Sequence, residues 1–346
     1  MTKTNKTTDM KKIFSSGLLV LLASVIFASG CKGTKALLPN VSGKACEIMV
    51  VIDKDYWEGP LGDEVRLVLA DEVPYLPQKE PLFNLSNVPL SGFSDLFRVH
   101  RNIMLLQVDP QIDSVGIFFH KDVWAAPQSV VQVSSYTSDE AIELIKDNAP
   151  LIVSYFEQAE RDRVIGNALL YEDHSIADTV SAIFGGSLHF PQGYKLRMAT
   201  DDFAWIAYDR EYVYQDILIY KYTITEKDPF SAENIIARRN EAMKENVPGM
   251  FENSYMTTSP VLKPLVEHVR YRNLDFMQTR GLWEVENDYM GGPFVAHSFY
   301  SQDGKDMIVT EAFVYAPRYD KRLYMLQAEA LLYSWEWAQK DEKEQN

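Results

Sequence analysis

Hydrophobic and polar residues follow regular periods over most of the chain, beginning near residue 44. A continuous apolar run at 46–52 predicts a buried strand. After it, Gly59-Pro60 precedes apolar residues at helical spacing, which predicts a helix that begins at Pro60. Further apolar runs predict strands at 103–108, 115–120 and 129–134.

Residues 137–171 carry a helical pattern with a proline inside it. Thr137 and Glu140 form a capping box, which predicts a helix that runs to Ala149. We expect Pro150 to kink or restart this helix, because proline has no backbone N–H and restricts the residue before it. The apolar stripe continues to about Tyr171, and we expect this long helix to pack across the first sheet.

Residues 174–192 predict a seam between two blocks, because a short helix is followed there by Gly185-Gly186 and Pro191-Gln-Gly193. The elements expected after the seam are strands near 194–199, 203–208 and 212–224, a helix from Ser231 to about Asn246, strands at 268–276 and 280–287, a hairpin at 294–315 that turns at Asp303-Gly304, and a helix at 318–338. The sequence thus predicts an α+β fold of two α/β sandwich-type blocks, 44–173 and 190–338, with mostly antiparallel sheets and packed helices.

The start of the chain has the pattern of a bacterial secretion signal. Four lysines precede an apolar run from Gly17 to Ala28, which is shorter than the ~20 residues that a spanning helix needs. The segment Ala28-Ser29-Gly30-Cys31 resembles a bacterial lipobox, which implies cleavage before Cys31 and acylation of that cysteine. Residues 1–30 are therefore predicted to be a lipoprotein signal peptide and residues 31–43 a tether. The alternative is an ordinary secretory signal with Cys31 as an incidental thiol.

Charge and cysteine content narrow the possible partners. The net charge is -15, which argues against nucleic-acid binding and against electrostatic adhesion to anionic lipid. We therefore expect the membrane contact to be made by the acyl chains on Cys31 and expect no nucleic-acid partner. If Cys31 is lipidated, Cys46 is left alone, and its place in an apolar run predicts a buried, inert thiol.

Motifs that bind cofactors or metals are absent from the sequence. It contains no glycine-rich phosphate loop, no Gly-x-Ser-x-Gly elbow, no His-Glu-x-x-His and no Cys-x-x-Cys. No cofactor and no metal site are therefore predicted. Of the scattered histidines, His297 stands out because it follows Gly291-Gly292-Pro293 on a predicted strand. It is a candidate binding residue, although a hydrogen-bonded position within the sheet would explain it equally well.

Two further groups of residues are candidates for a ligand site. Glu284 and Glu286 share one face of a predicted strand, as the acid and base of a glycoside hydrolase could, but a solvated sheet face gives the same pattern. Trp205 lies near several tyrosines on consecutive strands, and Trp283 lies beside the two glutamates. Such aromatic residues suit a sugar ring or a protein interface, and they also pack well within sheets.

The segment from Gly281 to Tyr300, followed by Glu311-Ala-Phe-Val-Tyr-Ala-Pro317, resembles a family of Bacteroidota lipoproteins of unknown function. The resemblance implies a cell-envelope location and no assigned activity. In that family, acidic residues after the lipidated cysteine accompany surface display. Lys32-Gly33-Thr34-Lys35 departs from that pattern, so we expect an outer-membrane anchor that faces the periplasm. The block at 190–338 is similar to the PsbP/Mog-type fold, which implies nothing about function.

Three functions are compatible with these features. The leading hypothesis is a non-catalytic envelope protein that binds another envelope component, a protein, through an aromatic-rich sheet face. The second is a periplasmic glycan- or lipid-binding module with its cleft between the two blocks. The third is a hydrolase that uses the paired carboxylates, so an enzyme is the less favoured reading of the sequence.

Overall fold

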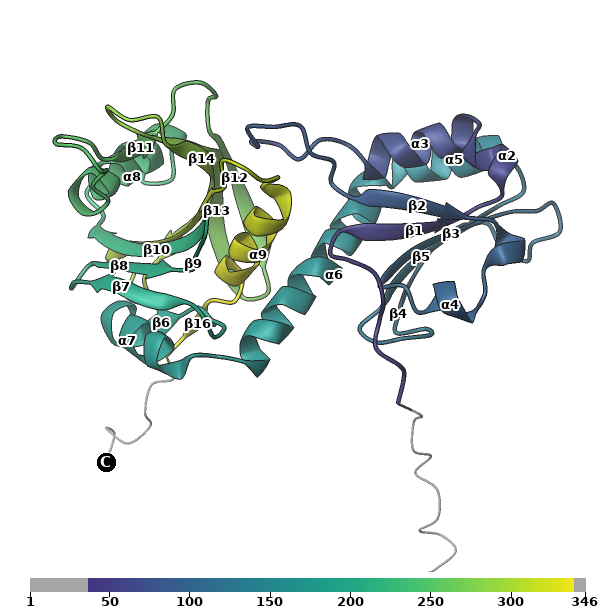
Figure 1. The fold of residues 1–346 in the computed structure, drawn as a ribbon, viewed down its shortest axis with the longest axis horizontal. Helices are drawn as coiled ribbons and strands as arrows, with labels where there is room; N and C mark the ends of the chain where they lie inside the picture. The colour runs from purple at the N-terminus through teal and green to yellow at the C-terminus, as the bar shows by residue number, and fades with distance from the viewer. Residues whose placement is uncertain (1–36, 339–346) are drawn as a thin grey trace, which may run out of the picture. The chain divides into compact units, whose positions relative to one another are not determined.

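The computed structural model describes residues 37–338. The predicted signal peptide, Cys31 and the first part of the predicted tether lie outside the described residues. The helices and strands described below lie in one compact unit that begins at Asn40 (Figure 1).

The first sheet of this unit has the strand order β2-β1-β3-β5-β4. Three of its pairs, β1–β2, β1–β3 and β3–β5, are parallel, and only β4 runs antiparallel to its neighbour. Its strands are β1 (Glu47–Val51), β2 (Asn84–Val88), β3 (Asn102–Val108), β4 (Gly116–Lys121) and β5 (Ser129–Ser135). The accompanying helices are α2 (Lys54–Trp57), α3 (Pro60–Leu69), η1 (Leu90–Gly92), α4 (Asp95–Arg98), α5 (Ser138–Asp147) and α6 (Ala149–Leu170).

The local signals in this region act as the sequence predicts. The Thr137 hydroxyl accepts a hydrogen bond from the Glu140 N–H at 3.3 Å, and the Glu140 carboxylate accepts one from the Tyr136 N–H at 2.8 Å. The helix restarts at Ala149, so Pro150 lies in a first turn, where a missing N–H costs nothing. Cys46 is buried as predicted, and burial raises the pKa of its thiol to about 12, which keeps it unreactive.

The second sheet is antiparallel in every pair. Its main path is β11-β13-β14-β15-β10-β8-β7, with β12 paired to β13 and β9 paired to β10. Its strands are β7 (Lys195–Ala199), β8 (Phe203–Ala207), β9 (Asp209–Arg210), β10 (Val213–Thr223), β11 (Met256–Thr258), β12 (Leu265–Tyr271), β13 (Leu274–Val285), β14 (Gly291–Tyr300) and β15 (Asp306–Tyr315). The other elements are α7 (His174–Phe184), α8 (Ala232–Asn246), α9 (Arg322–Leu332) and the short pair β6 (Gly186–Ser187) and β16 (Glu336–Trp337).

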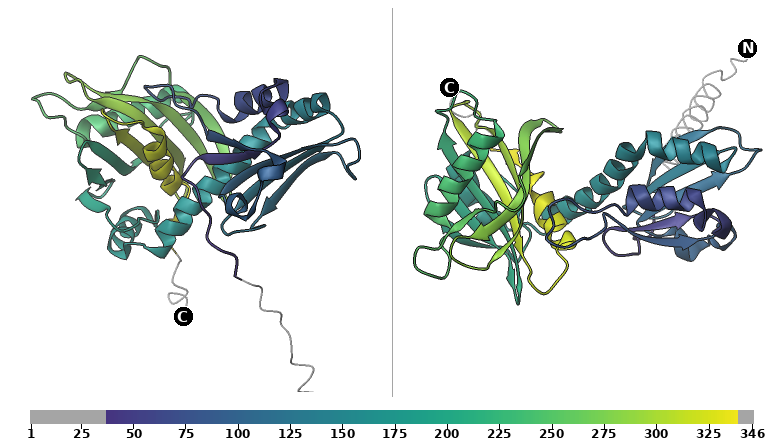
Figure 2. Two further views of the ribbon diagram at one scale, coloured as in Figure 1. Left: turned by 45° about the vertical axis from the view of Figure 1, so that its right-hand side comes forward. Right: turned by 90° about the horizontal axis from the view of Figure 1, so that it is seen from above.

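Helices pack on both faces of this nine-stranded sheet (Figure 2). On one face, α7 and α9 contact side chains such as Ile217 and Val295. On the other face, α8 contacts the alternate positions, such as Leu218 and Phe294. Since successive side chains of a strand point to opposite faces, the long apolar runs of this sheet supply two hydrophobic cores.

A buried ion pair attaches α8 to its face of the sheet. Arg239 on α8 is 1% exposed and Glu311 on β15 is 0% exposed. The Nε and Nη2 atoms of Arg239 donate to the two carboxylate oxygens of Glu311 at 2.9 and 2.6 Å. Its Nη1 donates to the Thr258 hydroxyl at 2.9 Å, and the guanidinium lies 3.8 Å from the centre of the Phe294 ring. The charges are thus matched and hydrogen-bonded, as burial requires.

The predicted α+β class is confirmed, and several of the predicted elements and pairings are corrected. The strands predicted at 268–276 and 280–287 are wrong, because the turn lies at Arg272-Asn273, where Arg272 has a φ of 52°. The first sheet contains an unpredicted strand, β2, and its parallel pairs depart from the mostly antiparallel expectation. The last helix spans only Arg322–Leu332, and at its start the Glu80 carboxylate accepts hydrogen bonds from the backbone N–H groups of residues 321 and 322.

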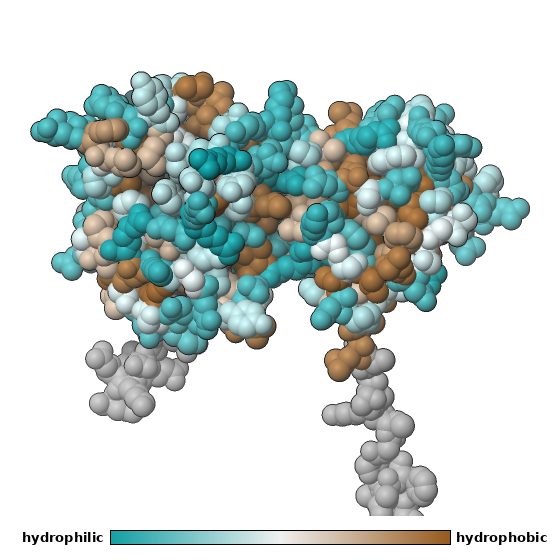
Figure 3. Space-filling model, viewed as in Figure 1, coloured by the Kyte–Doolittle hydropathy of each residue, from teal (hydrophilic) through white to brown (hydrophobic). Residues whose placement is uncertain are grey.

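The surface shows hydrophobic residues in scattered patches among hydrophilic ones on the face drawn in Figure 3. None of the helices within residues 37–338 is both long enough and apolar enough to span a membrane.

We expect Arg239→Met to lower the free energy of unfolding by about 3–5 kcal/mol, because it leaves the Glu311 carboxylate buried without a counter-charge. The double variant R239M/E311L should regain most of that loss, since two apolar side chains need no compensation for desolvation. Urea unfolding followed by circular dichroism measures both variants. Equal losses in the single and double variants would contradict this account of the pair.

Candidate functional site: an aromatic pocket on the nine-stranded sheet

A cavity of about 700 Å³ lies on the sheet face that carries α8. Six aromatic side chains contribute to its lining, and we call it the aromatic pocket. They are Trp205, Tyr212, Tyr214, Trp283, Phe313 and Tyr315. A volume in this range, with apolar walls and a few polar groups, is typical of ligand sites.

The pocket forms because α8 covers only part of this face. The helix ends at Asn246, and the following Val247-Pro248-Gly249 cannot extend it, since Pro248 has no backbone N–H to donate. Beyond that point Met250 forms part of the pocket edge. The uncovered end of the sheet therefore presents side chains from β8, β10, β13 and β15 to the cavity.

Asp216 is the buried polar group of the pocket. One carboxylate oxygen accepts a hydrogen bond from Trp205 Nε1 at 2.7 Å, and the other accepts one from the Tyr208 N–H at 3.3 Å. Arg197 Nη1 lies 3.9 Å from this carboxylate, and its guanidinium carbon lies 4.7 Å from the centre of the Trp205 ring. Burial raises the pKa of Asp216 to about 6, against the opposing effects of the Trp205 hydrogen bond and Arg197.

Trp283 contributes its ring to the pocket wall. Its side chain is 2% exposed, and its Nε1 has no hydrogen-bond partner in the described part of the chain. The ring is fixed edge-to-face against Phe313, with 5.3 Å between ring centres. A buried N–H without a partner is costly, and this one is closed off from the cavity, beside the backbone of Gly292.

The rim of the pocket carries exposed apolar residues next to arginines. Tyr214 is 37% exposed and stacks on Tyr315 with 5.6 Å between ring centres. Tyr212 and Met250 are also exposed, and the Arg318 guanidinium lies 3.7 Å from the centre of the Tyr212 ring. Tyrosine, methionine and arginine are the residue types enriched at protein interfaces.

The structure brings together two of the candidate residues from the sequence. Trp205 and Trp283 both line the aromatic pocket, although they lie on different strands. Glu284 is half-buried and Glu286 is exposed, and both border an adjoining open depression of about 790 Å³. Within residues 37–338, neither carboxylate has a hydrogen-bond or ion-pair partner, and neither lies in the aromatic pocket. Cys31 lies outside the described residues.

His297 is on the opposite face of the sheet from the aromatic pocket. It is fully buried, its ring stacks on Phe276 with 4.0 Å between ring centres, and Tyr333 packs edge-to-face against it at 4.6 Å. Its Nε2 is 3.2 Å from the side-chain nitrogen of Gln278. Burial holds the pKa of His297 well below its ordinary value, so the ring is neutral. Its Nε2 is thus hydrogen-bonded within the sheet, while its Nδ1 is buried without a partner among residues 37–338.

Sequence reasoning missed Asp216 and Arg197, which supply the buried carboxylate and a nearby cation that also pairs with Asp209 at 2.5 Å. Asp216 interrupts the apolar stretch of β10 between Val213 and Tyr220, and a carboxylate inside a buried strand was the available signal. Arg197 lies on β7, and nothing in its local pattern marks it. Across residues 37–338, no three His, Cys, Asp or Glu side chains are grouped so that they could hold a metal ion.

We expect Asp216→Asn to change how stability depends on pH. Folding raises the pKa of Asp216 from 3.8 to about 6, so the folded state favours the protonated carboxyl group. The stability that this preference contributes is present below about pH 4 and is lost as the pH rises through 6. Relative to the variant, the wild-type protein should lose about 2.5 kcal/mol of unfolding free energy between about pH 4 and pH 7. Urea unfolding at both pH values measures this. If the difference in unfolding free energy between the wild-type protein and the variant is the same at both pH values, folding leaves the pKa of Asp216 unaltered.

Comparison with known proteins gives domains without assigned functions. Residues 41–168 match the model described as "Domain of unknown function (DUF8532)", and residues 173–334 match "Domain of unknown function (DUF4837)". No curated protein matches the chain. A crystal structure from Bacteroides thetaiotaomicron is similar over 45% of this chain and 46% of its own, so the likeness spans less than half of that protein. The sequence identity is 8% and the TM-score is 0.25, which is too low to show a shared fold. The comparisons therefore connect both parts of the chain with families of unknown function.

Proposed function

We propose that this protein is a lipid-anchored, non-catalytic binding component of the bacterial cell envelope and that it binds an envelope protein through the aromatic pocket. The observation that carries the binding function is the uncovered end of the sheet, where aromatic residues surround the buried Asp216. The lipobox at Cys31 and the resemblance to Bacteroidota lipoproteins support the anchor and its place at the outer membrane, facing the periplasm.

The rim of the pocket favours a protein as the partner. Tyr212, Tyr214 and Met250 leave apolar surface exposed around a hollow, and Arg197 and Arg318 lie beside them. Energetically important interface residues are of these types and cluster around pockets that fill on binding. An apolar side chain of the partner would enter the hollow and contact the rings of β10 and β15.

A glycan is the second candidate, supported by the polar groups inside the pocket. The buried Asp216 carboxylate accepts a hydrogen bond from Trp205 Nε1 and lies beside the aromatic rings of the pocket. Sugar hydroxyls can donate to a carboxylate, while sugar C–H groups lie against aromatic faces. The hydrolase hypothesis lacks such support, because Glu286 is exposed and both glutamates border an open depression.

We expect a photocrosslinking residue at the pocket to capture the partner in living cells. Tyr214→p-benzoylphenylalanine should give one discrete product, and adding Trp205→Ala should abolish it, because the pocket loses one of its walls. Tyr136→p-benzoylphenylalanine is the matched control, since Tyr136 is 45% exposed and belongs to the other sheet's connections. Gel electrophoresis and mass spectrometry identify the products.

The nature of the crosslinked product separates the candidates. A protease-sensitive product supports a protein partner, and a product that resists protease but yields sugars on hydrolysis supports the glycan. The same products from positions 214 and 136, or products that persist with Trp205→Ala, would show that the aromatic pocket is not the binding site.

The anchor is tested separately from the pocket. We expect Cys31→Ala to move the protein from the membrane fraction to the soluble periplasm, because several acyl chains would be lost at ~0.8 kcal/mol per buried methylene. Fractionation and immunoblotting measure the distribution, and the unchanged urea midpoint of the soluble form serves as the folding control. A variant that still pellets with membranes would rule out lipidation of Cys31 as the anchor.

A further inference from the structure

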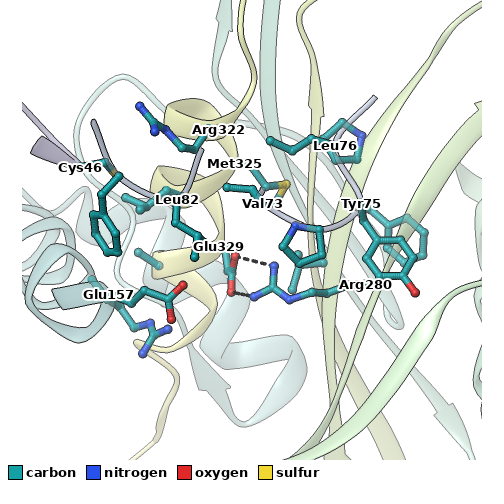
Figure 4. A pocket seen from close by; sticks show the side chains of 18 residues that line it. Cys46, Val73, Tyr75, Leu76, Leu82, Glu157, Arg280, Arg322, Met325 and Glu329 are labelled. Atoms are coloured by element: carbon teal, nitrogen blue, oxygen red, sulfur yellow. Dashed lines mark hydrogen bonds and ion pairs between the residues drawn. The ribbon is translucent and has the colours of Figure 1, made fainter. Parts of the chain in front are cut away.

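A second cavity, of about 270 Å³, lies between α6, α9 and the segment 73–83 (Figure 4). We call it the α6–α9 cleft. The segment is held in place by Glu80, whose carboxylate accepts hydrogen bonds from the backbone N–H groups of Lys321 and Arg322 at 2.7 and 2.9 Å. Leu76, Leu82 and Met325 give the cleft an apolar wall. The volume is slightly below the ~300–1,000 Å³ of drug-sized sites, so it suits a small ligand.

Two of the charged residues of the cleft are already paired. Arg280 Nη1 donates to one carboxylate oxygen of Glu329 at 3.0 Å, and its Nη2 donates to the other. Arg280 Nε donates to the side-chain oxygen of Gln278 at 3.1 Å. This bidentate pair therefore has little capacity left for a ligand.

Glu157 and Arg161 are one helical turn apart on α6 but are not paired with each other. Arg161 instead lies over the Tyr333 ring, 3.8 Å from its centre, and donates from Nη1 to Gln158 at 2.8 Å. Glu157 is half-buried and makes no hydrogen bond or ion pair with any described residue. Figure 4 shows its carboxylate directed into the cleft. Burial and the charge of Glu329 raise the pKa of Glu157.

The groups left without partners define the chemistry of a ligand. A half-buried carboxylate without a donor is costly, and an ammonium group would supply both a charge and hydrogen bonds. Arg161 also lines the cleft, and its remaining N–H groups can donate to a carboxylate on the same ligand. The apolar wall requires a hydrophobic group on the same small molecule.

We infer that the α6–α9 cleft binds a zwitterionic α-amino acid with an apolar side chain. Its ammonium group would donate to Glu157, its carboxylate would accept from Arg161, and its side chain would pack against Leu76, Leu82 and Met325. This site is distinct from the aromatic pocket, so it does not rest on the proposed function.

The test uses the purified chain from residue 32 onward and L-leucine as the probe, titrated by isothermal calorimetry with ligand-observed NMR. We expect L-leucine to bind and N-acetyl-L-leucine, which lacks the ammonium, to bind at least tenfold more weakly. L-leucinamide, which lacks the carboxylate, should lose at least as much. Failure of L-leucine to bind at 10 mM, or equal binding of either analogue, would overturn the inference.

The variant Glu157→Gln tests whether L-leucine binds in the α6–α9 cleft. It is nearly isosteric and removes a half-buried carboxylate, so we expect the variant to fold while its affinity for L-leucine falls at least tenfold. Glu143→Gln is the matched control, since Glu143 is an exposed helical glutamate on α5. A melting temperature no lower than that of the wild-type protein confirms folding of Glu157→Gln, and unaltered leucine binding by this variant would show that the ligand binds elsewhere.

Discussion

The buried ion pair between Arg239 and Glu311 determines where α8 lies on the nine-stranded sheet. Apolar contacts are non-directional and would tolerate several positions of a helix on a hydrophobic face. Two hydrogen bonds between a guanidinium and a carboxylate tolerate far fewer, because each bond has a narrow range of distance and angle. Arg239 lies in the middle of α8, so the pair also determines how far the helix reaches along the sheet before Pro248.

The aromatic pocket is the consequence of that limit. Where α8 ends, the strands still present large side chains, and they pack against one another around an open cavity. Asp216 is buried there at a cost, which its raised pKa expresses, and Trp283 keeps a donor unsatisfied within the described residues. A buried carboxylate with a raised pKa at the edge of an open cavity favours binding over a purely structural role.

The sequence predicted the elements that have strong local signals, including the cap at Thr137 and the hairpin turn at Asp303-Gly304. It missed β2, whose polar residues pair only with β1 at a sheet edge, and the turn at Arg272-Asn273, which lacks the glycine typical of such turns. Trp205 and Trp283 were identified singly. Their shared pocket depends on the order of β8, β10, β15, β14 and β13 across the sheet, which no local pattern contains.

Strand β13 connects the two candidate sites through the alternation of its side chains. Arg280 points to the α9 side and borders the α6–α9 cleft, whereas Trp283 points to the α8 side and lines the aromatic pocket. A shift of one residue in register would move both residues to the wrong face. Gly281 opposes such a change, because a Cβ there would lie 2.7 Å from the Phe294 ring on β14, so only glycine permits this close pairing. One strand register thus preserves both cavities.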